Sequence, residues 1–198
     1  RYYELNKFIV DNRILMVGND NDKRDLSYNL IVSNLNPSST VLIEGKNSIA
    51  DYNIGELEKF NRIILLSGSV TQNDIPKLQQ YVSNGGKILP NLLEGKDTIT
   101  QDDIADAFIS DSANKEIITK EISVNEVSVD LNGEEGFLVL SEKFAHFQGW
   151  TAKINGKELK IYKANNVISS VFLDGEKGKL IFKYSPDSFR RGRIISVT

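Results

Sequence analysis

Two aspartates, Asp20 and Asp22, have the residue type and spacing to hold a divalent cation. They follow a short apolar run from Arg13 to Gly18 that reads as a buried strand. The carboxyl end of such a strand is where a parallel sheet places its ligands, and two carboxylates would supply two hard oxygen ligands. The same residues also suit the cap and the acidic first turn of a helix. Both interpretations stay open on the sequence alone.

Three more polar residues follow the next two predicted strands. Lys46 comes after the strand at 40–44, and Ser67 and Ser69 come after the strand at 62–66. They could complete a shallow pocket with Asp20, or they could be ordinary loop residues at the end of a buried strand. Ser67 lacks the Gly-x-Ser-x-Gly turn of a serine nucleophile, and the one histidine lies far along the chain. No catalytic residue is therefore predicted.

A third group of candidates is aromatic. His146 and Phe147 stand just before Trp150, the only tryptophan of the chain. Aromatic rings on an exposed loop can stack on the face of a sugar, so these three residues are candidate glycan ligands. Trp150 also begins a predicted strand, where a single tryptophan is typical of a core anchor.

Composition excludes several classes of protein. There is no cysteine, which removes disulfides, thiolate zinc sites and cysteine nucleophiles. A net charge of -3 argues against nucleic acid and against anionic lipid headgroups as partners. No run approaches the roughly 20 apolar residues that span a bilayer. Since the chain begins at Arg1 without a signal segment, we expect it to be a piece of a longer protein.

The elements that position these residues predict an α/β protein of two domains. Strand-like and helix-like segments alternate as far as residue 110, which indicates βαβ units in a small parallel-sheet, three-layer domain of flavodoxin-like type. From residue 111 to 198 apolar and polar residues alternate with period two, and Gly turns such as Asn155-Gly156 separate the segments. This pattern predicts an antiparallel β-sandwich of about seven strands.

The first domain resembles the class I glutamine-amidotransferase-like domains. The resemblance is carried by Ser67-Gly68-Ser69, by a helix ending in Tyr81-Val82-Ser83-Asn84-Gly85-Gly86, and by Lys87-Ile88-Leu89. Active members of that family carry a nucleophilic cysteine, which this chain lacks. The resemblance therefore implies the flavodoxin-like fold without the activity.

The last third resembles the extracytoplasmic end of YfhO-type and glycosyltransferase-like multi-spanning membrane proteins. That family shows a Pro-Gly-Trp strand, an Asn/Asp-Gly-Lys turn and a Tyr-x-Pro-x-Ser-Phe segment leading into a membrane helix. This chain has Gly149-Trp150, Asn155-Gly156-Lys157 and the stretch Tyr184 to Phe189, but Gln148 replaces the proline. The resemblance implies that the 111–198 domain leads toward a membrane helix.

The leading hypothesis is a non-catalytic binding or assembly module on the extracytoplasmic face of the cell membrane, with no cofactor. Its partners would be the rest of its own membrane-embedded chain and a glycan or glycolipid, since the resemblance implies a parent that handles lipid-linked glycans or cell-envelope polymers. The alternative is a stand-alone, metal-dependent transferase or hydrolase that uses Asp20 and Asp22. Their Asp-x-Asp form is the one with which nucleotide-sugar glycosyltransferases hold a metal. A purely structural spacer is the third hypothesis.

Overall fold

The computed structural model describes residues 7–33, 39–100, 103, 107, 115–116, 119–123, 125–140, 148–166 and 168–186. They form two compact units. Unit 1 contains residues 7–9 together with the described parts of 115–163 and of 168–186, and unit 2 contains the described part of 10–114 together with 164–166. The sequence analysis placed residues 7–9 in the first domain and residues 164–166 in the second. In the structure, residues 7–9 belong to unit 1 with the later part of the chain, and residues 164–166 belong to unit 2.

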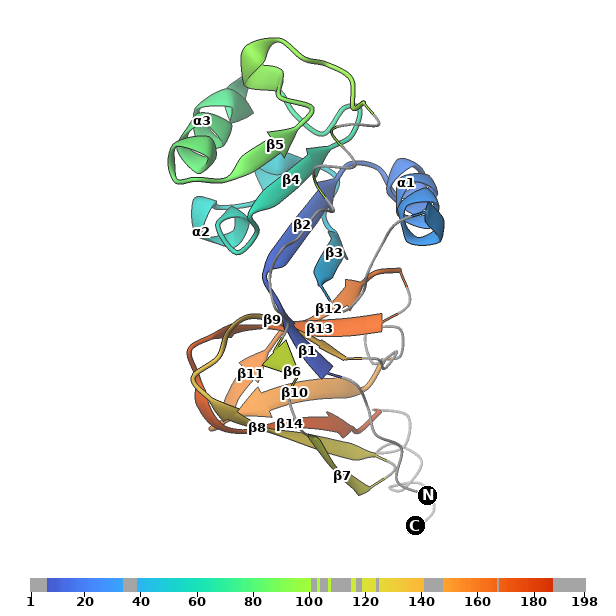
Figure 1. Cartoon of the computed structure of the whole chain (residues 1–198), viewed down its shortest axis with the longest axis vertical. Coiled ribbons are helices and arrows are strands. Elements are labelled where there is room, and N and C mark those ends of the chain that lie inside the picture. Colours follow the sequence, from blue (N-terminus) through green and yellow to red (C-terminus); the bar gives the residue numbers. More distant parts are fainter. Residues whose placement is uncertain are drawn as a thin grey trace, which may run out of the picture. The chain divides into compact units, whose positions relative to one another are not determined.

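Unit 2 is built on four parallel strands, ordered β5-β4-β2-β3 (Figure 1). The strands are β2 (Asn12–Val17), β3 (Thr40–Glu44), β4 (Arg62–Leu65) and β5 (Lys87–Leu89). The α-helices are α1 (Asp20–Ser33), α2 (Ile54–Leu57) and α3 (Ile75–Ser83). Three single 3-10 turns are η1 (Ile49–Asp51), η2 (Gln72–Asp74) and η3 (Leu92–Glu94).

Buried aliphatic side chains explain why these strands form. Ile14 and Met16 on β2 cluster with Leu42 on β3 and Ile64 on β4, and Leu26 of α1 packs against the cluster. Residues two apart on a strand share a face, so the β2 pair points to the α1 side of the sheet. The strands predicted at these positions are confirmed. The sequence also predicts a helix capped by Thr71 and running to about Val82, and in the structure this segment starts as η2 before α3.

An antiparallel segment from far along the chain closes the β3 edge of unit 2. Ala164, the last residue of β12 (Ile161–Ala164), pairs antiparallel with Ile43. The next residue, Asn165, is buried, donates its backbone N–H to the Leu42 carbonyl and accepts the Leu42 N–H on its side-chain oxygen at 2.7 Å. Its side-chain amide donates to the Thr40 carbonyl at 3.1 Å. A single asparagine thus supplies hydrogen bonds that a longer strand would otherwise provide.

Unit 1 consists of strands in two groups. One group is ordered β12-β13-β9-β1-β6 and the other is ordered β11-β10-β14-β8-β7. Apart from β12, the first group comprises β1 (Lys7–Val10), β6 (Lys115–Glu116), β9 (Glu135–Leu140) and β13 (Ile168–Asp174). The second comprises β7 (Thr119–Ser123), β8 (Glu126–Asn132), β10 (Trp150–Ile154), β11 (Lys157–Leu159) and β14 (Lys177–Tyr184).

Side chains from both strand groups share one apolar core in unit 1. Leu138 and Val171 of the first group join Val129, Ile154 and Phe182 of the second in a single buried cluster. The β10–β11 hairpin has the turn that its sequence predicts, because Asn155 and Gly156 both adopt positive φ between the paired Ile154 and Lys157.

The predicted fold class, a flavodoxin-like three-layer domain followed by a β-sandwich, is wrong. The parallel strands belong to a mixed sheet ordered β5-β4-β2-β3-β12-β13-β9-β1-β6, which is accompanied by the second, antiparallel sheet. The part of the chain that the structure describes contains fourteen strands with defined bounds but only three such α-helices, and α2 has four residues. The error arose because alternation along the chain reveals βαβ units, whereas the addition of a distant antiparallel strand to a sheet edge leaves no local pattern.

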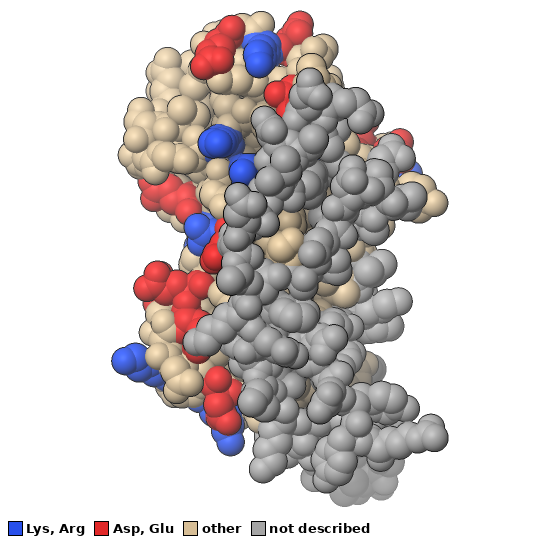
Figure 2. All heavy atoms as spheres, in the orientation of Figure 1, with Lys and Arg blue, Asp and Glu red and all other residues tan. Residues whose placement is uncertain are grey.

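Two further observations bear on function. Within the described ranges no helix is long and apolar enough to cross a membrane. On the face shown in Figure 2, the described basic and acidic side chains are interspersed instead of forming one charged field. The sequence also predicts a short helix at 102–109 and a last strand at 193–197, and these segments fall largely or wholly outside the described residues.

Candidate functional site

The loops that leave β2, β3 and β4 meet at the carboxyl edge of the parallel strands, as the sequence predicts. The Gly18 N–H donates to the Lys46 carbonyl at 3.2 Å, and the Ile49 N–H donates to the Ser69 carbonyl at 2.9 Å. Gly45 makes this close approach feasible, since a Cβ there would lie 2.3 Å from the Tyr52 hydroxyl. The three loops are therefore joined through backbone hydrogen bonds.

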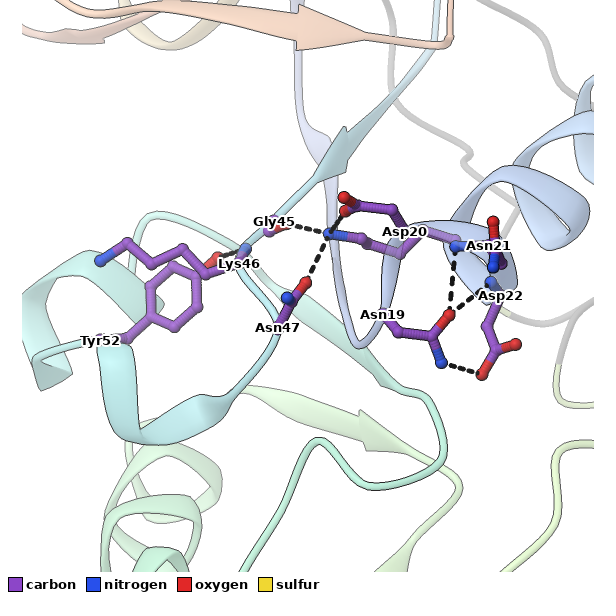
Figure 3. A network of polar contacts seen from close by, with 9 residues as sticks. Asn19, Asp20, Asn21, Asp22, Gly45, Lys46, Asn47 and Tyr52 are labelled. Carbon is purple, nitrogen blue, oxygen red and sulfur yellow. Dashed lines mark hydrogen bonds and ion pairs between the residues drawn. The ribbon is translucent and has the colours of Figure 1, made fainter.

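Asn19 caps the start of α1 and also forms a hydrogen bond with the Asp22 carboxylate. The Asn19 side-chain oxygen accepts the N–H groups of Asn21 and Asp22 at 3.1 and 3.0 Å, while its amide donates to Asp22 Oδ2 at 2.6 Å (Figure 3). The cap thus lies one residue before the acidic pair that the sequence singled out. One oxygen of the Asp22 carboxylate is part of this cap.

Lys23 is the residue at this edge that the sequence analysis missed. Only 3% of it is exposed, and its ammonium group has three oxygen neighbours: Asp20 Oδ1 at 2.9 Å, the Gly45 carbonyl at 2.5 Å and Asn47 Oδ1 at 3.4 Å. Lysine is unfavourable in the first turn of a helix because the dipole is positive there. That mismatch was the available signal. Lys23 connects the start of α1 to the loop after β3.

The four residues predicted beside Asp22 at this edge, namely Asp20, Lys46, Ser67 and Ser69, have different surroundings. Asp20 is ion-paired with Lys23, and its side chain is 90% exposed. Lys46 extends over the Tyr52 ring, 4.6 Å from the ring centroid, on the far side of Gly45 from Asp20 (Figure 3). Ser67 is exposed, whereas Ser69 is buried and its hydroxyl has no hydrogen-bond partner among the described residues.

No group of three or more His, Cys, Asp or Glu residues suited to a metal occurs within the described ranges. The Lys23 ammonium also lies beside the carboxylate that a cation would use, and this positive charge opposes cation binding. Metal binding by Asp20 and Asp22 stays a prediction.

Replacing Lys23 by methionine is expected to lower the free energy of unfolding by about 2 kcal/mol, because charge-assisted hydrogen bonds from a buried group are lost. Urea denaturation followed by circular dichroism measures the change. Lys46→Met is the matched control, since its side chain is 44% exposed. Equal losses of unfolding free energy in the two variants would show that Lys23 does not stabilise the contact between α1 and the loop after β3. A gain of stability from millimolar Mg²⁺ in the native chain would instead favour the metal site.

Trp150 is partly buried against the core of unit 1, and its ring centroid lies 5.3 Å from that of Tyr184. The two residues face each other in the β10–β14 register. The neighbouring Gly149 accepts the Ser185 N–H at 2.7 Å, and a Cβ on Gly149 would lie 2.7 Å from the Pro186 Cα. The Gly-Trp motif at the start of β10 therefore lies directly opposite the Tyr-x-Pro motif at the end of β14.

His146 and Phe147, the other two aromatic candidates, lie outside the described residues. The structure consequently does not test the glycan-stacking role predicted for them.

The α1 surface has a hollow of about 540 Å³ that sequence reasoning did not identify. It is lined by Arg24, Asp25 and Tyr28 of α1 and by Asn166. Tyr28 is 62% exposed, an unusual degree for a large apolar side chain. The spacing of 24, 25 and 28 places these residues on one helical face, which is the only signal the sequence contained.

The polar groups around Tyr28 are available to a ligand. Arg24 donates to Asn21 at 3.2 Å, whereas neither Asp25 nor the Asn166 side chain forms a hydrogen bond or ion pair with a described residue. Donors and acceptors of opposite charge thus surround an exposed aromatic ring. Such a surface suits a neutral, hydroxyl-rich ligand better than an ion.

One comparison with known proteins gives a match. The family model described as bacterial membrane protein YfhO matches residues 98–196, half of the 198 residues. No curated protein and no solved structure matches the chain. The comparisons support the resemblance seen in the last third of the sequence and do not support the amidotransferase-like resemblance of the first half.

Proposed function

The chain belongs to the YfhO family of bacterial membrane proteins, and from this membership we propose that it is a non-catalytic, glycan-binding module of such a protein. It works on the extracytoplasmic face of the membrane beside the membrane-embedded remainder of its own chain. The parent handles lipid-linked glycans or cell-envelope polymers, with the chemistry of a glycosyltransferase located outside this module.

The observation that carries the proposal is the α1 hollow. Tyr28 offers a flat apolar ring, Asp25 accepts from sugar hydroxyls, Arg24 donates to them, and Asn166 does both. The charges of Arg24 and Asp25 cancel, so the hollow does not select an ionic ligand. Arg24, Asp25 and Tyr28 precede the residues matched by the family, so this assignment rests on the geometry.

A non-catalytic role is supported by the carboxyl edge of the parallel strands. There the Asp20 carboxylate pairs with Lys23, which also donates to the Gly45 carbonyl. Asp22 accepts the Asn19 amide, and the Lys46 ammonium donates to the Asp51 carbonyl. Groups that are held in structural hydrogen bonds must break them before acting as general acids or bases. No observation at this edge therefore specifically favours the alternative function, a metal-dependent transferase or hydrolase.

Tyr28→Ala is expected to weaken glycan binding about tenfold, since the ring supplies most of the apolar contact area in the hollow. A glycan array identifies the ligand, and calorimetric titration of its best glycan compares the variant with the native chain. Val82→Ala, which removes an exposed apolar side chain from α3, is the control and should bind as the native chain does.

An array without any bound glycan would favour the structural spacer and overturn the proposal. Sidedness is tested in the full-length protein of intact cells. Ser67→Cys adds a thiol at an exposed position of a chain that has no cysteine of its own, and the native full-length protein is the control for any other thiol. Labelling by a membrane-impermeant maleimide is expected, and labelling only after lysis would place the module in the cytoplasm.

A further inference from the structure

A second hollow, of about 490 Å³, lies at the opposite, amino-terminal edge of the parallel strands of unit 2. Its lining comes from the start of β2, the segment leading into β4 and the end of α3. The residues are Arg13, Glu58, Phe60, Asn61, Tyr81, Asn84, Gly85 and Gly86. None of them lines the α1 hollow, so a ligand here would be independent of the proposed glycan.

The distinctive group in this hollow is the Arg13 guanidinium. It forms no hydrogen bond or ion pair with a described residue, and its Nε atom is buried without a partner. A buried donor that lacks a partner costs about 1–3 kcal/mol. The terminal N–H groups of the same guanidinium also have no partner among the described residues, so an acceptor that enters the hollow can bind them.

The other polar groups of the lining are largely occupied. The Asn61 side-chain oxygen accepts the Arg13 backbone N–H at 2.9 Å, and its amide donates to the Asp11 carbonyl at 2.8 Å. Asn84 donates to Glu58 Oε1 at 2.6 Å, and the Tyr81 hydroxyl donates to the Phe60 carbonyl at 3.0 Å. The charged groups of the lining that can still form hydrogen bonds with a ligand are the Arg13 guanidinium and the second carboxylate oxygen of Glu58.

These two unused groups define the ligand, and we propose that the hollow binds a small carboxylate that also carries a hydrogen-bond donor. The carboxylate pairs with the two terminal N–H groups of Arg13 in the bidentate geometry that guanidinium favours. A hydroxyl or ammonium group of the same molecule donates to Glu58. Sugar acids and amino acids share this chemistry.

The surroundings disfavour a phosphate. Glu58 contributes a negative charge to the lining, and α3 ends at Ser83 beside the hollow, so the negative end of its dipole faces the site. A dianion would meet both, whereas a single carboxylate is balanced by Arg13. Glycines complete the wall, and a Cβ on Gly86 would lie 2.2 Å from the Tyr81 ring.

The test is NMR titration of the chain with glucuronate, alanine, acetate and inorganic phosphate as separate probes. Glucuronate or alanine is expected to shift the Arg13 Nε–H signal and the Gly85 and Gly86 amides, and the one that does so identifies the source. Acetate, which lacks the donor, should bind more weakly, and phosphate should not compete.

Arg13→Gln is expected to weaken binding of the active probe at least about tenfold, the loss that corresponds to one charge-assisted pair. Lys153→Gln removes one positive charge from an exposed position on β10, lies in neither hollow, and should leave binding unchanged. Arg13→Lys keeps the charge without Nε and serves if Arg13→Gln fails to fold. The proposal would be overturned if neither glucuronate nor alanine shifted the Arg13 signals, if phosphate bound equally well, or if Arg13→Gln kept the native affinity.

Discussion

Asn165→Ala is expected to lower the free energy of unfolding by about 3 kcal/mol, because it leaves two buried backbone groups without partners. The Leu42 N–H and the Thr40 carbonyl both bond to the Asn165 side chain. Its φ of 46° adds to the cost, since alanine tolerates the left-handed region less well than asparagine. Urea denaturation followed by far-ultraviolet circular dichroism measures the loss.

Asn166→Ala is the matched control for this prediction. Asn166 has a φ of 63°, but its side chain forms no hydrogen bond with a described residue. The control shares the backbone penalty and lacks the hydrogen-bond penalty, so we expect a loss of about 1 kcal/mol. Equal losses in the two variants would mean that the Asn165 side chain does not secure the edge of β3.

Gly149→Ala is expected to cost about 3 kcal/mol through a steric clash combined with backbone strain. Gly149 has a φ of 104°, and the added Cβ would meet backbone atoms of Pro186, which no rotamer change can relieve. The ends of β10 and β14 must then separate where Trp150 packs on Tyr184. As the only tryptophan, Trp150 reports the change directly by fluorescence.

Gly156→Ala provides the comparison, because its φ is 82° and no atom lies within 4 Å of the added Cβ. It should cost about 1 kcal/mol and leave the Trp150 emission unchanged. If Gly149→Ala unfolds no earlier than Gly156→Ala, the pairing of the Gly-Trp and Tyr-x-Pro motifs is not a stabilising contact.

Local patterns predicted much of the secondary structure. The buried aliphatic runs that became β2 and β4 are recognisable because a parallel strand is covered on both faces. The Asn155-Gly156 hairpin is recognisable because its turn needs two residues that tolerate positive φ. In both cases the determining interactions lie within a few residues of each other.

The fold class was not predictable in the same way. Ile43 pairs with Ala164, more than a hundred residues further along the chain, and the pairing depends on one asparagine side chain rather than on a hydrophobic period. Asparagine in a turn has many local explanations. The mixed sheet could therefore be identified only from the three-dimensional contacts of the folded chain.

The candidate sites show the same division. From the sequence we located the carboxyl edge of the parallel strands and selected its acidic residues, Asp20 and Asp22, as candidates. The residue that joins α1 to the loop after β3 is Lys23, which pairs with Asp20 and donates to the Gly45 carbonyl of that loop. Tyr28 and Arg13 were missed because exposure and the lack of a partner are properties of the folded chain. The family was recognisable from short motifs, since Gly-Trp and Tyr-x-Pro are fixed by direct contact.

The most direct test of glycan binding is amide chemical-shift mapping with the best glycan from the array. The account predicts saturable shifts at Arg24, Asp25, Tyr28 and Asn166, the residues of the α1 hollow. Shifts confined to Trp150 and its neighbours, or no shifts at all, would contradict the assignment of glycan binding to this surface.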